Sequence, residues 1–222
     1  MNRVIGLGLF FILLPLYLII VLVLACIQGL PVFFSQERVG VMNCRFKLYK
    51  FRTMIENPSK IVNSITTSND VRVTKIGGVL RKFKIDELPQ LINIIKGDIN
   101  FVGPRPEVTE FVGLLPHYFS FLETCKPGIT DLSSIIFKNE SELLDDKNPY
   151  QYYLNSILPV KSKLAQLFIK KNSFILRISI VCITIISIFH HELALRLVSI
   201  FIPVHDIELR HSINHLLNIN FF

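Results

Sequence analysis

The longest apolar stretch of the chain lies at its N-terminus. Residues 4–27 contain no charged side chain, and about 20 apolar residues in a helix are enough to cross the hydrocarbon core of a bilayer. Pro15 lies within this stretch, where proline removes a helical hydrogen bond and bends the helix. Three interpretations stay open at this point: a secretory signal, a spanning anchor, or a re-entrant helix that returns to its side of origin.

Basic residues flank the apolar stretch on both sides. Arg3 precedes it, and Arg38, Arg45 and Lys47 follow it. Basic residues favour the cytoplasmic side of a membrane. The flanks therefore favour the re-entrant helix, with both of its ends in the cytoplasm.

The segment after the apolar stretch has the pattern of a small β-hairpin. Residues 28–31 contain Gly and Pro and end the helix, and residues 32–34 and 45–51 predict two short strands. Residues 37–43 would form the turn between these strands. Residues 57–70 are rich in Ser, Thr and Asn, which predicts a surface loop.

An amphipathic pattern starts at Asp86. Four apolar residues follow at the i, i+3, i+4 and i+7 spacing of one helix face, namely Leu88, Leu91, Ile92 and Ile95. Asp86 is a favourable N-cap, Pro89 falls in the first turn, and Gly97 is a typical C-terminal stop. The sequence therefore predicts a helix that begins at Asp86 and ends before Gly97.

The C-terminal third contains two further apolar segments. Residues 149–171 are aromatic and basic and predict a helix on the membrane surface. Residues 174–189 are apolar apart from Arg177 and a few polar residues, and either an interfacial or a short spanning helix remains open. His211 and His215 have the i, i+4 spacing that permits metal binding on a helix, although solvated histidines are the default interpretation.

Composition agrees with membrane association. Half of the 222 residues are hydrophobic and 18% are charged, below the roughly 25% of typical soluble domains. The net charge of +7 favours anionic partners such as lipid headgroups or phosphates. No recognised nucleic-acid-binding motif accompanies this charge, so we expect no nucleic-acid partner. The four cysteines show no paired spacing, which indicates free thiols in a reducing compartment.

Acidic and basic residues meet at the start of the predicted helix. Asp86 and Glu87 would lie at its N-terminus, where the helix dipole stabilises carboxylates and attracts phosphate. The simplest interpretation is that Asp86 only caps the helix and that Glu87 is only a first-turn charge. However, Arg81, Lys82 and Lys84 precede the pair, and such a combination of carboxylates and cations suits phosphoryl transfer.

Arg105 adds a further cation after the predicted helix. Pro104 and Pro106 bracket it and restrict where its guanidinium can point. A guanidinium held in this way suits bidentate phosphate binding. The carboxylates of Asp86 and Glu87 could then attack phosphorus or hold Mg²⁺.

Ordered motifs with compatible spacing follow one another over roughly residues 1–190. They are Phe33-Phe34-Ser35-Gln36-Glu37-Arg38-Val39-Gly40, Lys50-Phe51-Arg52-Thr53-Met54, Asp70-Val71-Arg72-Val73-Thr74, Gly77 with Leu80-Arg81, Asp86-Glu87-Leu88-Pro89-Gln90-Leu91-Ile92-Asn93, Gly97-Asp98, Val102-Gly103-Pro104-Arg105-Pro106 and Lys126-Pro127-Gly128-Ile129-Thr130. With these motifs the chain resembles the bacterial sugar transferases, the monotopic polyprenyl-phosphate phosphoglycosyl transferases that initiate glycan assembly.

The resemblance and the hydropathy pattern together predict the architecture. We expect an α+β, mostly helical fold with a compact catalytic core and a small β-hairpin. Residues 1–28 would form the re-entrant membrane helix, residues 29–150 the catalytic domain on the cytosolic face, and residues 151–222 interfacial amphipathic helices and a tail. The location implied is the cytoplasmic face of the bacterial inner membrane.

The resemblance also implies a reaction. Asp86 would attack the β-phosphate of a UDP-sugar, release UMP and form a phosphosugar ester. Undecaprenyl phosphate would then attack this ester, giving a lipid-linked diphosphosugar for exopolysaccharide or lipopolysaccharide biosynthesis. Glu87 matches the partner carboxylate that assists proton transfer or metal binding, and Asp86 and Glu87 would hold Mg²⁺. The implied substrate-binding residues are Arg81 and Arg105, which match positions that hold phosphates, with Lys50, Arg52, Pro104 and Pro106.

Two departures from the family pattern stand out. Asp131-Leu132-Ser133-Ser134 follows Thr130, where the family often has Gly with Gln shortly after, and this region could influence the choice of sugar. Only Arg3 and two other residues precede the apolar stretch, as expected for a minimal catalytic form. The sugar, the glycan pathway and the oligomeric state stay open, and a homo-oligomer is compatible with the sequence. The alternative function is a non-enzymatic, membrane-anchored scaffold that binds anionic lipid.

Overall fold

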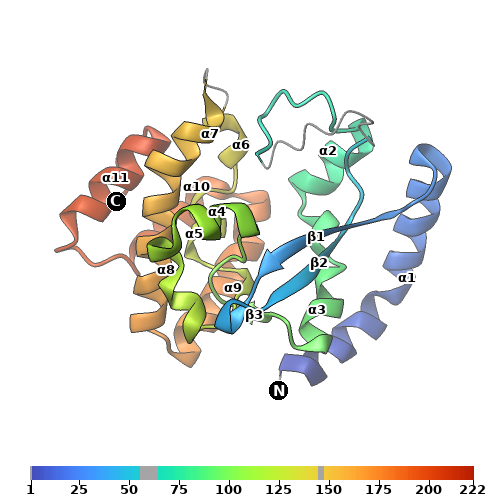
Figure 1. Ribbon diagram of the computed structural model, residues 1–222, viewed down its shortest axis with the longest axis horizontal. Coiled ribbons are helices and arrows are strands. Elements are labelled where there is room, and N and C mark those ends of the chain that lie inside the picture. Colours follow the sequence, from blue (N-terminus) through green and yellow to red (C-terminus); the bar gives the residue numbers. More distant parts are fainter. Residues whose placement is uncertain (1, 56–64, 145–147) are drawn as a thin grey trace.

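The N-terminal apolar segment is one helix. The computed structural model describes residues 2–55, 65–144 and 148–222 (Figure 1). Helix α1 (Asn2–Gln28) includes Pro15 and is long and apolar enough to cross a membrane. The predicted helix is confirmed, and its assignment continues through Pro15, so the proline does not end it. Proline removes one hydrogen bond, yet its fixed φ is close to that of a helix.

Both ends of α1 contact the same domain (Figure 1). Near its start, Asn2 Nδ2 donates a hydrogen bond to Asn100 Oδ1 at 2.8 Å. At its other end, the guanidinium of Arg52 donates to the carbonyl oxygens of Gln28 and Gly29. The folded domain therefore holds α1 at both of its ends.

The predicted β-hairpin is confirmed. Strands β1 (Phe33–Val39) and β2 (Arg45–Phe51) pair in antiparallel register, with Phe33 opposite Phe51 and Val39 opposite Arg45. The first strand is longer than expected, and a short 3₁₀ turn, η1 (Val41–Asn43), connects the two. Of the predicted surface loop at 57–70, residues 57–64 lie outside the described residues, and residues 65–70 form no helix or strand.

Helix α2 (Lys75–Lys82) follows, with Thr74 as its N-cap. Gly77 lies against the backbone of Thr53, where an added Cβ would come within 2.1 Å of the Thr53 carbonyl oxygen. Glycine is therefore required for α2 to approach the end of the hairpin this closely. The approach brings the last turn of α2, with Arg81, next to β2.

Asp86 does not cap the helix that follows it. It lies inside a 3₁₀ turn, η2 (Ile85–Glu87), and helix α3 (Gln90–Lys96) begins three residues after Glu87, with Pro89 as its N-cap. Lys84 precedes the turn in a left-handed conformation, with φ of 55°. The chain thus enters the helical segment through a tight turn and leaves the Asp86 side chain without a capping role. The predicted stop at Gly97 is confirmed, with φ of 90°.

The remaining elements form the main core. They are β3 (Asn100–Val102), α4 (Thr109–Leu114), η3 (Pro116–Glu123), β4 (Gly128–Thr130, parallel to β3), α5 (Leu132–Ile136), α6 (Glu140–Leu143), α7 (Pro149–Tyr152), the π-helix η4 (Tyr153–Ile157), α8 (Leu158–Lys170), α9 (Phe174–Phe189), α10 (His191–Ser199) and α11 (Ile207–Leu217). Together with the hairpin they give the α+β, mostly helical fold that the sequence predicts.

The two predicted C-terminal segments pack on this core. In the 149–171 segment, Ile157, Leu164 and Phe168 are buried in the main core, so one side of this segment packs on protein, and its placement on the membrane surface stays a prediction. Helix α9 has the predicted bounds, and 16 residues are fewer than the roughly 20 that a span needs. One face of α9 packs on α5, β3 and β4, which favours the interfacial interpretation. All four cysteines are free, as predicted.

Candidate active site

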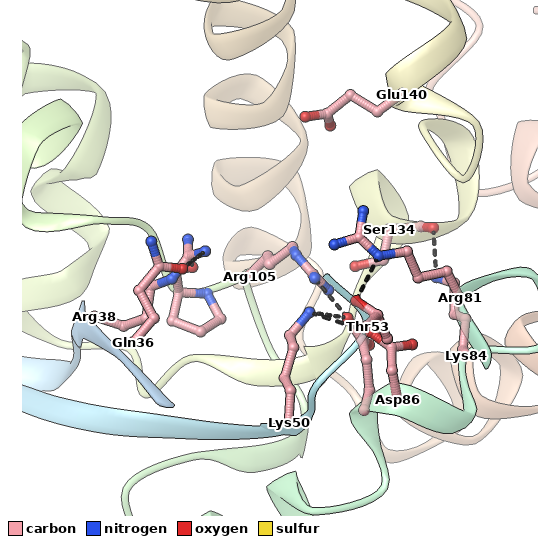
Figure 2. Close-up of polar contacts among 12 residues, drawn as sticks. Gln36, Arg38, Lys50, Thr53, Arg81, Lys84, Asp86, Arg105, Ser134 and Glu140 are labelled. Atoms are coloured by element: carbon pink, nitrogen blue, oxygen red, sulfur yellow. Dashed lines mark hydrogen bonds and ion pairs between the residues drawn. The ribbon is translucent and has the colours of Figure 1, made fainter. Parts of the chain in front are cut away.

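Four chain segments bring charged residues to one place (Figure 2). Strand β2 supplies Lys50, the last turn of α2 supplies Arg81, and the η2 turn supplies Asp86 and Glu87. The loop between β3 and α4 supplies Arg105. Most of the predicted site residues are therefore gathered in the folded chain, although they are spread over more than fifty positions of the sequence.

Glu87 is tied to two cations. Its side chain is buried, and its Oε1 accepts hydrogen bonds from Lys50 Nζ at 2.8 Å and from Arg105 Nη2 at 2.6 Å. Burial acts to raise the pKa of Glu87, but Arg105, Lys50 and Lys84 together hold it well below its usual value. Glu87 is therefore ionised and fixed between its partners, and it raises the pKa of Arg105 in return.

Asp86 lies beside Glu87 in a different electrostatic setting. Its side chain is also buried, at 6% exposure, and none of the described residues donates a hydrogen bond to it. The contact closest to an ion pair is Lys50 Nζ, 4.0 Å from Asp86 Oδ2. Burial raises the pKa of Asp86, and Lys50 only partly opposes this effect. The carboxylate is thus poorly satisfied by the protein and available to bind or attack a ligand.

Two further cations border Asp86 without an ion-pair partner. Arg81 donates from Nε to Thr53 Oγ1 at 2.8 Å, and Lys84 donates from Nζ to the Ser134 carbonyl oxygen at 3.1 Å (Figure 2). Neither has a carboxylate within 4.0 Å among the residues described. Burial lowers the pKa of both groups. Their remaining N–H donors can therefore bind anionic ligand atoms.

Lys84 was not among the predicted site residues. The sequence feature that could have identified Lys84 is its position two residues before Asp86, at the end of a basic run. Its left-handed backbone and its reach to α5 could not be deduced from the spacing, because they depend on how η2 packs on the rest of the domain.

Arg105 is positioned by its loop and by Arg38. Arg38 Nη1 donates to the carbonyl oxygen of Pro106 at 3.1 Å and forms an ion pair with Glu107 at 3.4 Å. Pro104 accepts a hydrogen bond at its carbonyl oxygen from Gly128 N at 3.0 Å. The two prolines therefore hold the loop on both sides of Arg105. Arg38, which the motif contained without an assigned role, supports the loop from β1.

Arg52 lies apart from the other predicted binding residues. Its guanidinium donates to the carbonyl oxygens of Gln28, and of Gly29 at 2.7 Å, at the C-terminal end of α1. A cation at this end of a helix also opposes the negative end of the helix dipole. The contacts of Arg52 in this structure are thus with α1, and those of Lys50, two residues earlier, are with the carboxylate pair.

The carboxylates of Asp86 and Glu87 are suitable ligands for a magnesium ion that binds together with substrate phosphates. Mg²⁺ is usually held by one or two carboxylates together with substrate phosphates and water, and Asp86 and Glu87 offer two adjacent carboxylates. Within residues 2–55, 65–144 and 148–222, no group of three or more His, Cys, Asp or Glu side chains is placed to hold a metal. His211 and His215 accordingly lack a third ligand there, although their ring centroids lie 6.4 Å apart.

Sequence comparisons bear on this site. The profile of the family described as bacterial sugar transferase matches residues 1–191. A UDP-N-acetylgalactosamine-undecaprenyl-phosphate N-acetylgalactosaminephosphotransferase of Aeromonas hydrophila is 39% identical over 109 residues, which cover 48% of this chain and 26% of the relative. The exopolysaccharide production protein ExoY of Sinorhizobium fredii is 36% identical over 141 residues, covering 57% of this chain and 62% of the relative.

A third relative resembles the chain over a similar segment. A UDP-glucose:undecaprenyl-phosphate glucose-1-phosphate transferase of Klebsiella pneumoniae is 36% identical over 138 residues, which cover 59% of this chain and 29% of the relative. The chain thus spans from about a quarter to just under two thirds of the length of these three relatives.

Proposed function

The chain belongs to the bacterial sugar transferase family, and from this premise we propose that it transfers a sugar-1-phosphate from a UDP-sugar to undecaprenyl phosphate. The observation that carries the proposal is the contrast between the two carboxylates. Glu87 is fixed by Lys50 and Arg105, whereas Asp86 is buried beside the same cations without a hydrogen bond from the described residues. An ionised carboxylate in this position is a competent nucleophile toward phosphorus.

The first step forms a covalent ester on Asp86. An oxygen of the Asp86 carboxylate attacks the β-phosphorus of the UDP-sugar and forms a new O–P bond. The bond from this phosphorus to the oxygen that bridges it to the α-phosphate breaks, and UMP leaves with the electron pair. Arg81 and Arg105 bind the phosphate oxygens and stabilise the charge that develops there.

The second step transfers the phosphosugar to lipid. An oxygen of undecaprenyl phosphate attacks the same phosphorus, the bond to Asp86 breaks, and the carboxylate is restored. Glu87 keeps Lys50 and Arg105 in place through both steps, because its carboxylate binds both cations. Asp86 and Glu87 would hold Mg²⁺, which would neutralise part of the diphosphate charge.

The site lies at a membrane in this proposal. The apolar helix α1, which packs along α3, would anchor the catalytic domain to the cytoplasmic face of the bacterial inner membrane. Tyr17 in α1 donates from its hydroxyl group to the carbonyl oxygen of Leu88, one residue after Glu87. The membrane helix thus contacts the turn that carries the two carboxylates, and this contact supports a lipid substrate.

The proposal is tested with purified protein, undecaprenyl phosphate and a panel of UDP-sugars. We expect one or a few UDP-sugars to yield UMP and a lipid-linked diphosphosugar. Intact-mass measurement after brief exposure to the active UDP-sugar alone should detect a sugar-phosphate adduct on the protein. A protein that binds anionic lipid but neither releases UMP nor forms an adduct with any UDP-sugar would instead be the scaffold considered above.

A further inference from the structure

Basic side chains gather beside the catalytic turn on the side of Lys84. Lys138 Nζ donates to the carbonyl oxygens of Ser187 and Ile188, at the C-terminal end of α9. Burial lowers the pKa of His191, and Lys138 and Lys84 lower it further. Burial also lowers the pKa of Lys138, and Lys82 adds to this effect. These four residues, Lys82, Lys84, Lys138 and His191, are referred to below as the basic cluster.

The lysines of the basic cluster form no ion pair with a carboxylate of the described residues. None of its three lysines has a carboxylate within 4.0 Å among the described residues, since the hydrogen bonds of Lys84 and Lys138 go to backbone carbonyl oxygens. The Nδ1 atom of His191 is buried and has no hydrogen-bond partner in the described parts of the chain. Lys82 is exposed, whereas Lys84, Lys138 and His191 are partly buried, and partly buried cations or polar atoms without such partners are costly. A bound anion would compensate the charge of the lysines and give His191 Nδ1 a hydrogen-bond partner.

An apolar surface leads to this cluster along α9. The large exposed apolar residues of α9 recur about one helical turn apart and so lie along one side of the helix. They are Phe174, Ile175, Ile178, Val181, Ile185 and Phe189, named the α9 stripe below. The opposite face packs on the core through Leu176, Ile180 and Ile183. The stripe extends for about 24 Å and ends at Phe189, two residues before His191.

We propose that the basic cluster and the α9 stripe together dock the lipid acceptor, a long-chain polyprenyl phosphate. This inference rests on the function proposed above. The phosphate monoester would lie against Lys84, Lys138 and His191, and the hydrocarbon chain would lie along the stripe. Charge complementarity at one end and a long apolar surface at the other match this amphipathic ligand. A nucleotide sugar has no long apolar part and would leave the stripe uncovered.

The place of the cluster in the reaction follows from in-line displacement. UMP leaves from the side of the phosphorus opposite to the attacking oxygen of Asp86. The acceptor oxygen must displace Asp86 from that same side after UMP has left, so the acceptor phosphate is needed only in the second step. Lys84 lies two residues from Asp86 and connects the cluster to the catalytic turn. Lys82, Lys138 and His191, the members of the cluster outside the active site, therefore act in the second step and are not needed for the first.

Measuring the two half-reactions separately distinguishes binding of the lipid acceptor from catalysis. The adduct is first formed with the active UDP-sugar, and free nucleotide is removed. Undecaprenyl phosphate in neutral detergent is then added, and loss of the adduct is followed by intact mass. For the double variant Lys82→Met/Lys138→Met we expect wild-type adduct formation and a half-saturating acceptor concentration raised about tenfold. Lys138→Arg keeps the charge and the donors to the α9 carbonyls, and should behave as the wild type.

Two lysines provide matched controls. Lys75 lies at the opposite end of α2 from Lys82, and Lys171 Nζ donates to the carbonyl oxygen of Phe201 at 2.9 Å, as Lys138 does to those of α9. Lys75→Met and Lys171→Met remove the same charge outside the cluster. We expect both to leave the half-saturating acceptor concentration unchanged. An equal increase in these controls would indicate a general effect of net charge and would contradict the proposal.

The hydrocarbon part of the site is tested with Ile178→Ser/Ile185→Ser. This variant should also raise the half-saturating concentration of undecaprenyl phosphate and leave adduct formation unchanged. Phosphatidylglycerol distinguishes the acceptor from bulk lipid. If the cluster variant binds phosphatidylglycerol vesicles weakly but discharges its adduct with wild-type half-saturation in neutral detergent, the cluster binds membrane headgroups and our assignment is wrong. Failure of the wild type to form any adduct would instead refute the proposed function.

Discussion

The carboxyl groups of Asp86 and Glu87 are adjacent in sequence and both buried, yet their pKa values are displaced in opposite directions. The cause is that the neighbouring cations contact the two carboxylates unequally. Lys50 and Arg105 both bind Glu87 directly, whereas Lys50 reaches Asp86 only at 4.0 Å. The fold therefore stabilises the ionised form of Glu87, whereas burial disfavours the ionised form of Asp86. This difference suits a structural role for Glu87 and a reactive role for Asp86.

The first prediction concerns stability at neutral pH. A raised pKa means that folding favours neutral Asp86, so Asp86→Asn should leave the melting temperature unchanged or raise it. A lowered pKa means that folding favours ionised Glu87, and Glu87→Gln should destabilise the protein by roughly 2–4 kcal/mol because Arg105 and Lys50 lose their partner. Thermal and denaturant unfolding of both variants would check this, and a larger loss in Asp86→Asn would contradict it.

The second prediction concerns pH. The stabilising contribution of Glu87 is present above its unfolded pKa of about 4.5 and is lost as the pH falls through its lower folded value. Asp86 must be ionised to attack, and its pKa lies above 3.8. Adduct formation should therefore decline on acidification while the fold is still intact. The rate of adduct formation and the circular dichroism, measured over the same pH series, would separate these events.

Lys50 provides an internal check on this pH dependence. Lys50 lowers the pKa of Asp86, so Lys50→Met should shift the acidic decline of adduct formation to higher pH. Lys47 lies on the same strand and is exposed, and Lys47→Met is the matched control. An unshifted profile in Lys50→Met would show that a group other than Asp86 governs the decline.

The sequence predicted both the hairpin and the residues of the site, but for different reasons. Strand residues 45–51 carry a local pattern, and the left-handed stop at Gly97 needs only one residue type, so both were predicted correctly. The gathering of Lys50, Arg81, Asp86, Glu87 and Arg105 was anticipated from a series of motifs and a family resemblance. No periodicity within any one segment predicts these long-range contacts.

The error in the helix start arose where the packing of a turn outweighed a local preference. Asp86 matched the N-cap pattern, but left-handed Lys84 and the η2 turn displaced the helix start to Gln90. The helix assignment of α1 continues through Pro15, and several apolar residues of the 149–171 segment are buried in the main core. The placement of both segments at a membrane stays a prediction.

The third prediction concerns the nucleophile. Asp86→Asn keeps the size of the side chain and removes its charge, so we expect a folded, membrane-bound protein whose transferase activity is lower by about three orders of magnitude or more. Its intact mass should show no adduct after exposure to the active UDP-sugar. Glu87→Gln should be severely impaired as well, because Lys50 and Arg105 lose their anchor. Mapping of the wild-type adduct to a residue other than Asp86 would refute the assigned role.

The fourth prediction concerns metal. Attack of a carboxylate on a diphosphate brings like charges together, and the cations at the site are already shared with Glu87. We therefore expect that chelation with EDTA abolishes turnover and that Mg²⁺ restores it. The melting temperature should not change on chelation, since the ion would enter with the substrate phosphates. Full turnover in excess EDTA after metal-free preparation would be incompatible with a metal requirement.

The last prediction concerns the topology of α1. A 27-residue helix is about 40 Å long, and a spanning helix of this length would place its ends on opposite sides of the bilayer. Instead, Asn2 contacts Asn100, and Arg52 contacts the carbonyl oxygens at the other end of α1. Because the same domain holds both ends, we expect residues 2 and 40 to face the same side, the cytoplasm.

This topology is measured with single cysteines at positions 2 and 40, in a variant that lacks the native thiols. A membrane-impermeant thiol reagent applied from the periplasm should label neither position, and both should react once the membrane is permeabilised. Periplasmic labelling at position 2 but not at position 40 would establish a spanning helix. In that case the contacts of Asn2 and of Arg52 with their partners could not both exist in the membrane-bound protein, because a bilayer would separate them.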